Sequence, residues 1–328
     1  MPLPDFLLIG APKAGTTALH STLAPHPELY LSAVKEPRFF LCDGRPPPSR
    51  GGPGDAQTYQ EYVWRRADYE ALFADAPPGT LRGESSPFYL HDRDAQRRIR
   101  RLIPEAKLIA VLRDPVERAH SNWAHLWSAG LEPYADFVAA CRQEKSRIDD
   151  GWAPFWCYTG LGRYGEQLEH LYKVFPREQV LLLRYRDLHD APTAVLDRIC
   201  TFLGVETGLL DRIPKENVRA HVPPSVVNSG LQTVLRRGAA VGHAFPLPVR
   251  KAARAPLLAV LQRSRKRRPR ITPLQRREVL RYFVDDIPRL EQVTGESYHD
   301  CRPRSTTPQC LADRCQRLGP QVAATYSA

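Results

Sequence analysis

The most constraining feature of the sequence is a short apolar run that leads directly into a glycine-containing loop. Residues 6–9 read FLLI, residues 10–17 read GAPKAGTT, and a helical pattern follows to Leu23, before Pro25 and Pro27. A buried strand, a tight loop and a helix in this order bring backbone N–H groups and the positive end of a helix dipole to one point. The segment therefore predicts a phosphate-binding turn in an α/β protein.

Further strand and helix patterns alternate along the first two thirds of the chain. Apolar, strand-like runs occupy residues 80–84, 106–112 and 179–185, and helical stretches fall at about 93–102, 115–129, 134–147, 160–174 and 190–203. Strands that are almost continuously apolar are typical of parallel sheets buried on both faces. We therefore expect a P-loop-like three-layer α/β fold, in which helices flank a central parallel sheet.

Beyond about residue 206 the strand patterns fade and the chain reads as helical, with an amphipathic helix near 273–287. We expect a single domain over residues 1–300, made of an α/β core (about 1–205) and a helical extension (about 206–300), followed by a loosely ordered tail at 301–328. A Pro/Gly-rich loop at 43–57 is long for a simple connection, and we interpret it as disordered or as a mobile lid.

The net charge of +11 is concentrated in one segment of the 328-residue chain. Between Arg250 and Arg281 there are twelve Lys and Arg residues and one acid, Glu278, so that the remainder is balanced. The run RSRKRRPR at 263–270 has three interpretations: a solvated loop, a nucleic-acid patch, or a cover over a bound nucleotide. The absence of interleaved aromatic residues disfavours nucleic acid.

Two features bear on the cellular compartment. The sequence has neither the roughly 18–20 consecutive apolar residues of a membrane span nor the basic start of a signal peptide. Its seven cysteines are an odd number without a C-x-x-C pair, which argues against zinc spacing and a complete disulfide framework. We therefore expect a cytoplasmic protein with reduced thiols.

The loop at 10–17 departs from the GxxxxGK[ST] pattern of nucleoside triphosphatases. Gly10 and Gly15 have the expected separation, but Thr16 holds the lysine position and Lys13 lies inside the loop. This displacement, together with the lack of a Walker-B-like aspartate, argues against a P-loop nucleotide kinase or NTPase, which remains the alternative hypothesis.

Two segments carry a resemblance to a known family. PKAGTTAL at 12–19 resembles the 5′-phosphosulfate loop of sulfotransferases that use 3′-phosphoadenylyl sulfate (PAPS). LRDPVERAHS at 112–121 is similar to the family's second landmark, where an arginine and a serine eight residues later, here Arg113 and Ser121, hold the 3′-phosphate. The resemblance implies a PAPS-dependent sulfotransferase, similar to bacterial members and to the heparan sulfate or Golgi-type domain.

Four weaker matches follow in the family's order. They are VKEPRFF at 34–40, GESSPFYL at 83–90, RYGEQL at 163–168 and the closing helix from 280 to Gly295. The heparan sulfate enzymes have a catalytic lysine at the position of Ser85, so a polysaccharide acceptor does not follow from the resemblance.

The resemblance also assigns roles. Lys13 would stabilise the leaving phosphate and Glu36 would take the proton of the acceptor hydroxyl. The donor would be bound by Lys13, Ala14, Gly15, Thr16, Thr17, Arg113, Ser121, Tyr164, Lys266 and Arg267. No metal is expected, because charge builds on a phosphate that is already a stable leaving group.

Alternatives remain at three positions. His20 and His120 are alternative candidates for the base, although His20 is better interpreted as packing or facing solvent. Ser85 or its neighbour Ser86 is a candidate to contribute a hydroxyl to the sulfate or the acceptor. Glu36 itself has a second interpretation, as an ion-pair partner of Lys35 or Arg38. The acceptor is expected to be a small molecule or a glycoconjugate, without nucleic acid or a membrane span, and the oligomeric state is not predicted. A non-catalytic PAP-binding protein is a third hypothesis, which the presence of both Lys13 and Glu36 disfavours.

Overall fold

The chain forms one sheet of five parallel strands, in the order β2-β3-β1-β4-β5. The computed structural model describes residues 2–48, 50–53, 62–214, 226–241, 247–263, 270–298 and 301. The strands are β1 (Phe6–Gly10), β2 (Leu29–Leu31), β3 (Leu81–Ser85), β4 (Lys107–Leu112) and β5 (Val180–Arg184). The predicted α/β class with a parallel central sheet is confirmed.

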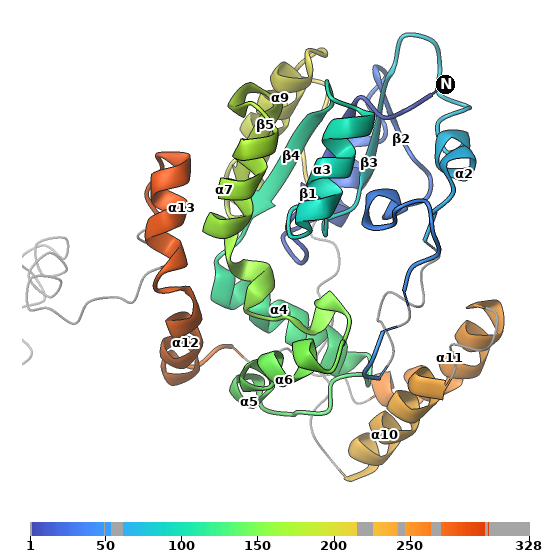
Figure 1. Cartoon of the computed structure of the whole chain (residues 1–328), viewed down its shortest axis with the longest axis vertical. Coiled ribbons are helices and arrows are strands. Elements are labelled where there is room, and N and C mark those ends of the chain that lie inside the picture. Colours follow the sequence, from blue (N-terminus) through green and yellow to red (C-terminus); the bar gives the residue numbers. More distant parts are fainter. Residues whose placement is uncertain are drawn as a thin grey trace, which may run out of the picture.

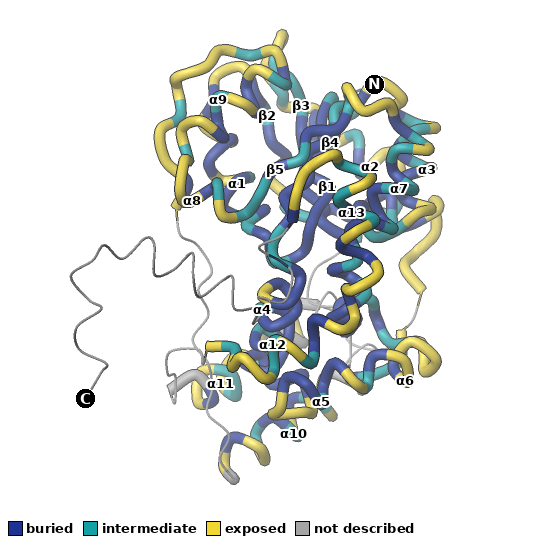
Figure 2. The backbone as a smooth tube through the Cα atoms, turned by 90° about the vertical axis from the view of Figure 1, so that its left-hand side faces the viewer, coloured by how far each residue is buried: buried dark blue, intermediate teal, exposed yellow. Residues whose placement is uncertain are grey.

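Helices cover both faces of this sheet, as Figure 2 shows. One face carries α1 (Thr16–Leu23), α8 (Asp187–Asp190) and α9 (Pro192–Leu203), and the other carries α3 (Arg93–Leu102), α7 (Tyr164–Val174) and α13 (Asp286–Thr294). The short helix α2 (Arg66–Ala71) lies beyond the β2 edge (Figure 1).

A second group of helices lies beyond the carboxyl ends of the strands, in the lower half of Figure 1. It contains α4 (Pro115–Ser128), α5 (Phe137–Arg142), α6 (Glu144–Asp149), α10 (Val226–Val241), α11 (Leu247–Arg263) and α12 (Pro273–Leu280). Phosphate-binding loops in open parallel sheets lie at this end of the strands, so the second group surrounds the region where a ligand would bind.

The central strand β1 is fully buried, with every residue from Phe6 to Ile9 at 0% exposure. Its Phe6 ring lies across β3 at Gly83, where an added Cβ would be 2.2 Å from the ring. Any larger residue at Gly83 would displace β3, because close-packed cores accommodate added atoms only by shifting backbone or side chains.

The structure corrects several boundaries predicted from the sequence. The strand β2 and the helix α2 were not predicted; β2 has three residues and is held mainly by pairing with β3. The stretch 134–147 forms two helices, α5 and α6, and the stretch 160–174 begins as a 3₁₀ turn at 160–162. The predicted helix at 273–287 is interrupted by a 3₁₀ turn at 281–283, so that α12 and α13 are separate.

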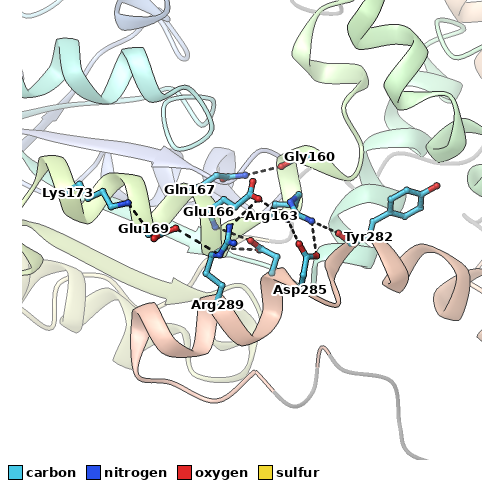
Figure 3. A network of polar contacts seen from close by, with 11 residues as sticks. Gly160, Arg163, Glu166, Gln167, Glu169, Lys173, Tyr282, Asp285 and Arg289 are labelled. Atoms are coloured by element: carbon cyan, nitrogen blue, oxygen red, sulfur yellow. Dashed lines mark hydrogen bonds and ion pairs between the residues drawn. The ribbon is translucent and has the colours of Figure 1, made fainter.

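Arg163 attaches this interruption to α7. Its guanidinium donates to the Tyr282 carbonyl at 2.9 Å, to Asp285 at 2.6 Å and to Glu166 at 2.8 Å (Figure 3). Arg289 of α13 pairs with the same Glu166 at 3.2 Å. These contacts hold α12 and α13 beside the carboxyl ends of β4 and β5, where they form one wall of the site.

Some predictions fall outside the described residues. The tail from 302 onward is one, and the loop at 43–57 is described only at 43–48 and 50–53, where Gly51 forms an isolated bridge with Trp152. The division into core and extension stays a prediction. Within the described ranges, every helix is too short or too polar to cross a bilayer.

Candidate functional site

The loop after β1 has the backbone of a phosphate-binding turn. Lys13 and Gly15 both adopt left-handed conformations, with φ of 70° and 87°, and α1 begins at Thr16 directly after Gly15. A Cβ at Gly15 would lie 3.1 Å from the Tyr185 ring, so the turn needs glycine both for its φ and for its close packing. A lysine held at positive φ is uncommon outside functional turns.

Arg113 connects this loop to β4 and β5. Its Nη1 donates to the Lys13 carbonyl at 3.1 Å, its Nη2 donates to Glu117 at 3.3 Å, and its guanidinium lies 4.4 Å from the centroid of the Tyr185 ring. Arg113 Nε is buried and, among the described residues, has no hydrogen-bond partner. A guanidinium N–H without a hydrogen-bond partner, beside the loop at residues 10–17 (the phosphate-type loop), can donate to an anionic oxygen of a ligand.

A cavity of about 1140 Å³ opens on the Arg113 side of the loop. It lies between the ends of β4 and β5 and the helices α12 and α13, and both Arg113 and Tyr164 line it. The residues that line the cavity include six arginines and three acids: Arg113, Arg184, Arg186, Arg276, Arg277, Arg281, Asp114, Glu117 and Asp286. The cavity is therefore net positive and has an aromatic wall, which suits an anionic nucleotide.

Two residues that support the loop were not assigned roles from the sequence. His125 Nδ1 lies 3.3 Å from Lys13 Nζ, and the fully buried Arg118 donates to the Pro12 carbonyl at 3.5 Å. Both belong to α4. His125 follows Ser121 by four residues and so shares its helix face, a spacing that could have indicated it.

Glu36 lies on a segment that is tied to the end of β3. Backbone N–H groups of Ser32 and Glu36 donate to the carbonyls of Gly83 and Ser85 at 2.9 and 3.0 Å, and the Arg38 N–H donates to Ser86 Oγ at 3.1 Å. Glu36 and Arg38 both have a φ of 59°, in the left-handed region. These three backbone hydrogen bonds hold the segment in place although two of its residues have strained backbone conformations.

The Glu36 carboxylate forms two ion pairs, with Lys35 at 2.6 Å and with Arg38 at 2.7 Å. Burial favours a raised pKa for Glu36, but the two neighbouring cations outweigh it, so the pKa lies below its ordinary value. The contacts of the ion-pair interpretation are therefore present, and Glu36 is held as a carboxylate at neutral pH.

A second carboxyl, Glu84, lies behind this segment and is fully buried. The Tyr69 hydroxyl donates to it at 3.3 Å, while the Tyr89 hydroxyl accepts from the Phe40 N–H at 3.3 Å. Burial raises the pKa of Glu84 to about 7, against the lowering effect of hydrogen bonds from Ser86 and the two tyrosines. The Glu36 segment therefore rests on a carboxyl that titrates near neutral pH.

The two histidines considered as alternative bases lie in different surroundings. His20 is half-buried, and its Nδ1 lies 2.8 Å from Ser85 Oγ, which corrects the interpretation that it faces solvent or only packs. His120 is buried between the rings of Trp123 and Phe137. His20 thus contacts Ser85 of β3, whose carbonyl accepts the Glu36 N–H at 3.0 Å.

The predicted site residues therefore fall into three groups. Lys13, Ala14, Gly15, Thr16 and Thr17 form the loop and the start of α1, with Arg113 and Tyr164 at the cavity beside it. Ser121 is half-buried on α4 and does not line the cavity. Lys266 and Arg267 lie outside the described residues. In the described part of the chain, no group of three or more His, Cys, Asp or Glu side chains could hold a metal ion.

Comparison with known families agrees with this geometry. The model of the sulfotransferase family matches residues 4–208, which span the loop, the Glu36 segment, Arg113 and all five strands. The chain belongs to the sulfotransferase family and is a transferase enzyme; PAPS is the general sulfuryl donor of the family.

Individual relatives cover part of the same region. Human heparan sulfate glucosamine 3-O-sulfotransferase 6 is 29% identical over 211 residues, 64% of this chain and 54% of that protein. Human heparan sulfate glucosamine 3-O-sulfotransferase 3B1 is 30% identical over 211 residues, 64% of this chain and 48% of that protein. The chain thus matches about half the length of these relatives.

A solved structure is similar over nearly the whole chain. A sulfotransferase from Alicyclobacillus acidocaldarius superposes with a TM-score of 0.70 and 26% identity, covering 92% of this chain and all of the other. The fold is thus that of a sulfotransferase beyond the region matched by the family model.

Proposed function

We propose that this chain transfers the sulfuryl group of PAPS to a hydroxyl of an acceptor and releases 3′-phosphoadenosine 5′-phosphate (PAP). The observation that carries the proposal is the position of Arg113. It joins the phosphate-type loop to the net-positive cavity, and its buried Nε has no hydrogen-bond partner among the described residues. A ligand with phosphates at two positions satisfies both regions at once.

The loop accounts for the leaving group. As the acceptor oxygen forms its bond to sulfur, the bond from sulfur to the 5′-phosphate oxygen breaks and its electron pair stays on PAP. The Lys13 ammonium and the N–H groups at the start of α1 stabilise that developing charge. His125, 3.3 Å from Lys13 Nζ, helps to position the ammonium.

Glu36 accounts for the proton. The acceptor hydroxyl must lose its proton as it attacks, and the Glu36 carboxylate is ionised at neutral pH because of Lys35 and Arg38. A base paired with two cations is a weak one until a pair is released. We propose that the sulfuryl group, which is also anionic, competes for Lys35 and leaves Glu36 free to accept the proton.

The names of the matched relatives support a broad class of acceptor for this chain. The matched relatives are named as sulfotransferases of glucosamine in heparan sulfate, which supports a glycoconjugate or a small hydroxyl compound as the acceptor. Ser85 replaces a lysine that the resemblance places in the polysaccharide enzymes. We propose a cytoplasmic location for the reaction, since Cys42, Cys141, Cys157 and Cys200 are buried thiols.

The direct test is turnover of PAPS by the purified chain. PAP release is followed by chromatography with heparan sulfate, an alkyl glucoside or a phenol as acceptor, and the products are searched for the mass of one added SO₃ group. We expect PAP and a sulfated product with at least one acceptor, and a rate roughly 10²- to 10³-fold lower for Lys13→Ala, the usual effect of losing one transition-state donor. Hydrolysis of ATP with Mg²⁺, with PAPS left intact, would contradict the proposal.

A further inference from the structure

His20 belongs to the helix that follows the phosphate-type loop, but the transfer described above does not use it. It lies four residues after Thr16 on α1, so the two side chains share one helix face. Its Nδ1 is 2.8 Å from Ser85 Oγ, and the Ser85 carbonyl accepts the Glu36 N–H at 3.0 Å. Ser85 therefore connects His20, on the donor side, with the segment that carries the base.

The charges around His20 keep its ring neutral. Burial and the Lys35 ammonium lower its pKa to about 4, and the Glu36 carboxylate opposes them only in part. The groups that act on the ring are thus Ser85, Lys35 and Glu36, from β3 and from the segment after β2. A neutral imidazole at working pH binds a partner through hydrogen bonds and not through charge.

One ring nitrogen remains available for a ligand. Within the described residues, Ser85 is the single hydrogen-bond partner that the structure records for the His20 side chain, and the contact engages Nδ1. When the Ser85 hydroxyl donates to Nδ1, the neutral ring carries its hydrogen on Nε2. His20 is half-buried, so the side chain is held at Nδ1 and is still partly exposed.

We propose that His20 Nε2–H hydrogen-bonds the oxygen of the acceptor hydroxyl, beside Glu36, and that Ser85 fixes the ring for this contact. The inference rests on the proposed sulfuryl transfer and deepens it by naming a residue that binds the acceptor. His20 gains and loses no proton: the hydroxyl proton goes to Glu36, one lone pair of the oxygen attacks sulfur, and the other accepts from His20.

Asn and Gln variants of His20 distinguish the role of Nδ1 from that of Nε2. The Gln amide nitrogen reaches the position of Nε2, whereas the Asn side chain reaches only that of Nδ1. We compare His20→Leu, His20→Asn and His20→Gln with His170→Leu, a matched control on α7 whose Nδ1 contacts Gln96 at 2.6 Å on the opposite face of the sheet. PAP affinity is measured by calorimetry, and PAP release from PAPS is measured with heparan sulfate, an alkyl glucoside or a phenol as acceptor, and with water as the only acceptor.

The expected result is an effect on turnover without an effect on the donor. His20→Leu and His20→Asn should bind PAP as the wild type does and release PAP roughly 2- to 10-fold more slowly, the effect of one neutral hydrogen bond. His20→Gln should retain most of the rate, and His170→Leu should retain all of it. If His20→Leu does not fold, the comparison of the Asn and Gln variants decides.

Other outcomes overturn the inference in distinguishable ways. Rescue by Asn and not by Gln would mean that the ring only supports Ser85, and an unchanged rate in all variants would mean that His20 does not bind the acceptor; the proposed function would stand in both cases. A wild-type chain that binds PAP but leaves PAPS intact with every one of these acceptors contradicts the proposed function itself, and the inference with it.

Discussion

The guanidinium of Arg113 donates a hydrogen bond to the carbonyl oxygen of Lys13 across 3.1 Å, although 100 residues separate them in the chain. Through this contact, the end of β4 holds the left-handed turn that follows β1. The same side chain stacks on Tyr185 after β5 and lines the net-positive cavity. Arg113 thus contacts the loop after β1 and also lines the cavity.

The first prediction concerns Arg113. Arg113→Lys keeps the charge but loses the planar fork that reaches both the Lys13 carbonyl and an anionic ligand. We expect PAP affinity to fall roughly 10- to 150-fold, which corresponds to about 1.5–3 kcal/mol for a charge-assisted hydrogen bond. Calorimetric titration with PAP measures this, with the exposed Arg97→Lys on α3 as the control. Equal affinities for the two variants would remove Arg113 from the donor site.

The second prediction concerns Glu36. Glu36→Gln should lower the rate of PAP release roughly 10²- to 10⁴-fold, the range for a positioned base, and leave PAP binding unchanged. Glu169→Gln on α7, which pairs with Lys173 at 3.4 Å, serves as the matched control. Unchanged turnover in Glu36→Gln would assign the carboxylate to its ion pairs alone.

The same carboxylate makes a prediction for pH. Because the pKa of Glu36 lies below its ordinary value of 4.5, Glu36 stays ionised as the pH falls toward that value. We therefore expect the Glu36-dependent limb of kcat/KM, which reports the free enzyme, to be lost only below pH 4.5, and a pH profile of kcat/KM measures it. A Glu36-dependent limb of kcat/KM near pH 6 would show that the ion pairs with Lys35 and Arg38 are absent in the free enzyme.

The fourth prediction concerns the stability of the fold around Glu84. In the unfolded chain this carboxyl loses its proton near its ordinary value of 4.5, whereas the folded chain retains the proton until about pH 7. The folded state therefore binds more protons in this window, and its stability falls as the pH rises through it, by up to about 1.4 kcal/mol per pH unit.

Glu84→Gln removes this titration. Urea unfolding at pH 5, 6, 7 and 8 should show the variant gaining stability relative to the wild type as the pH rises to about 7. A constant difference between the two proteins across this range would mean that Glu84 is ionised in the folded state at all four pH values.

Much of the fold was predictable because its signals are local. The strand-like runs at residues 6–9 and 106–112 are almost continuously apolar and are flanked by loop residues. Both form strands of the sheet, as expected. In contrast, β2 depends on pairing with β3 over three residues, which no local pattern shows. The break between α12 and α13 is likewise stabilised from a distance, by Arg163.

The candidate site shows the same difference between local sequence patterns and contacts that form only in the folded chain. The motifs that contain Lys13 and Arg113 are each contiguous in sequence and could be recognised there, whereas the contact between the two residues is tertiary. His125 and His20 were not assigned their contacts, since each one meets its partner only after folding: His125 meets Lys13, and His20 meets Ser85. The four-residue spacing from Ser121 to His125 could have indicated the helix face of His125. No sequence pattern indicates that His20 lies at the end of β3.

The most direct test of the account is a thermal-shift titration of the whole chain with PAP, with ATP and Mg²⁺, and with AMP. A ligand at about 100 times its Kd adds roughly 2.7 kcal/mol of stability, which a melting curve resolves. The account predicts a concentration-dependent rise of Tm with PAP that neither ATP with Mg²⁺ nor AMP reproduces, and that Arg113→Lys weakens. Stabilisation by ATP with Mg²⁺ and none by PAP would contradict it and favour a nucleotide kinase.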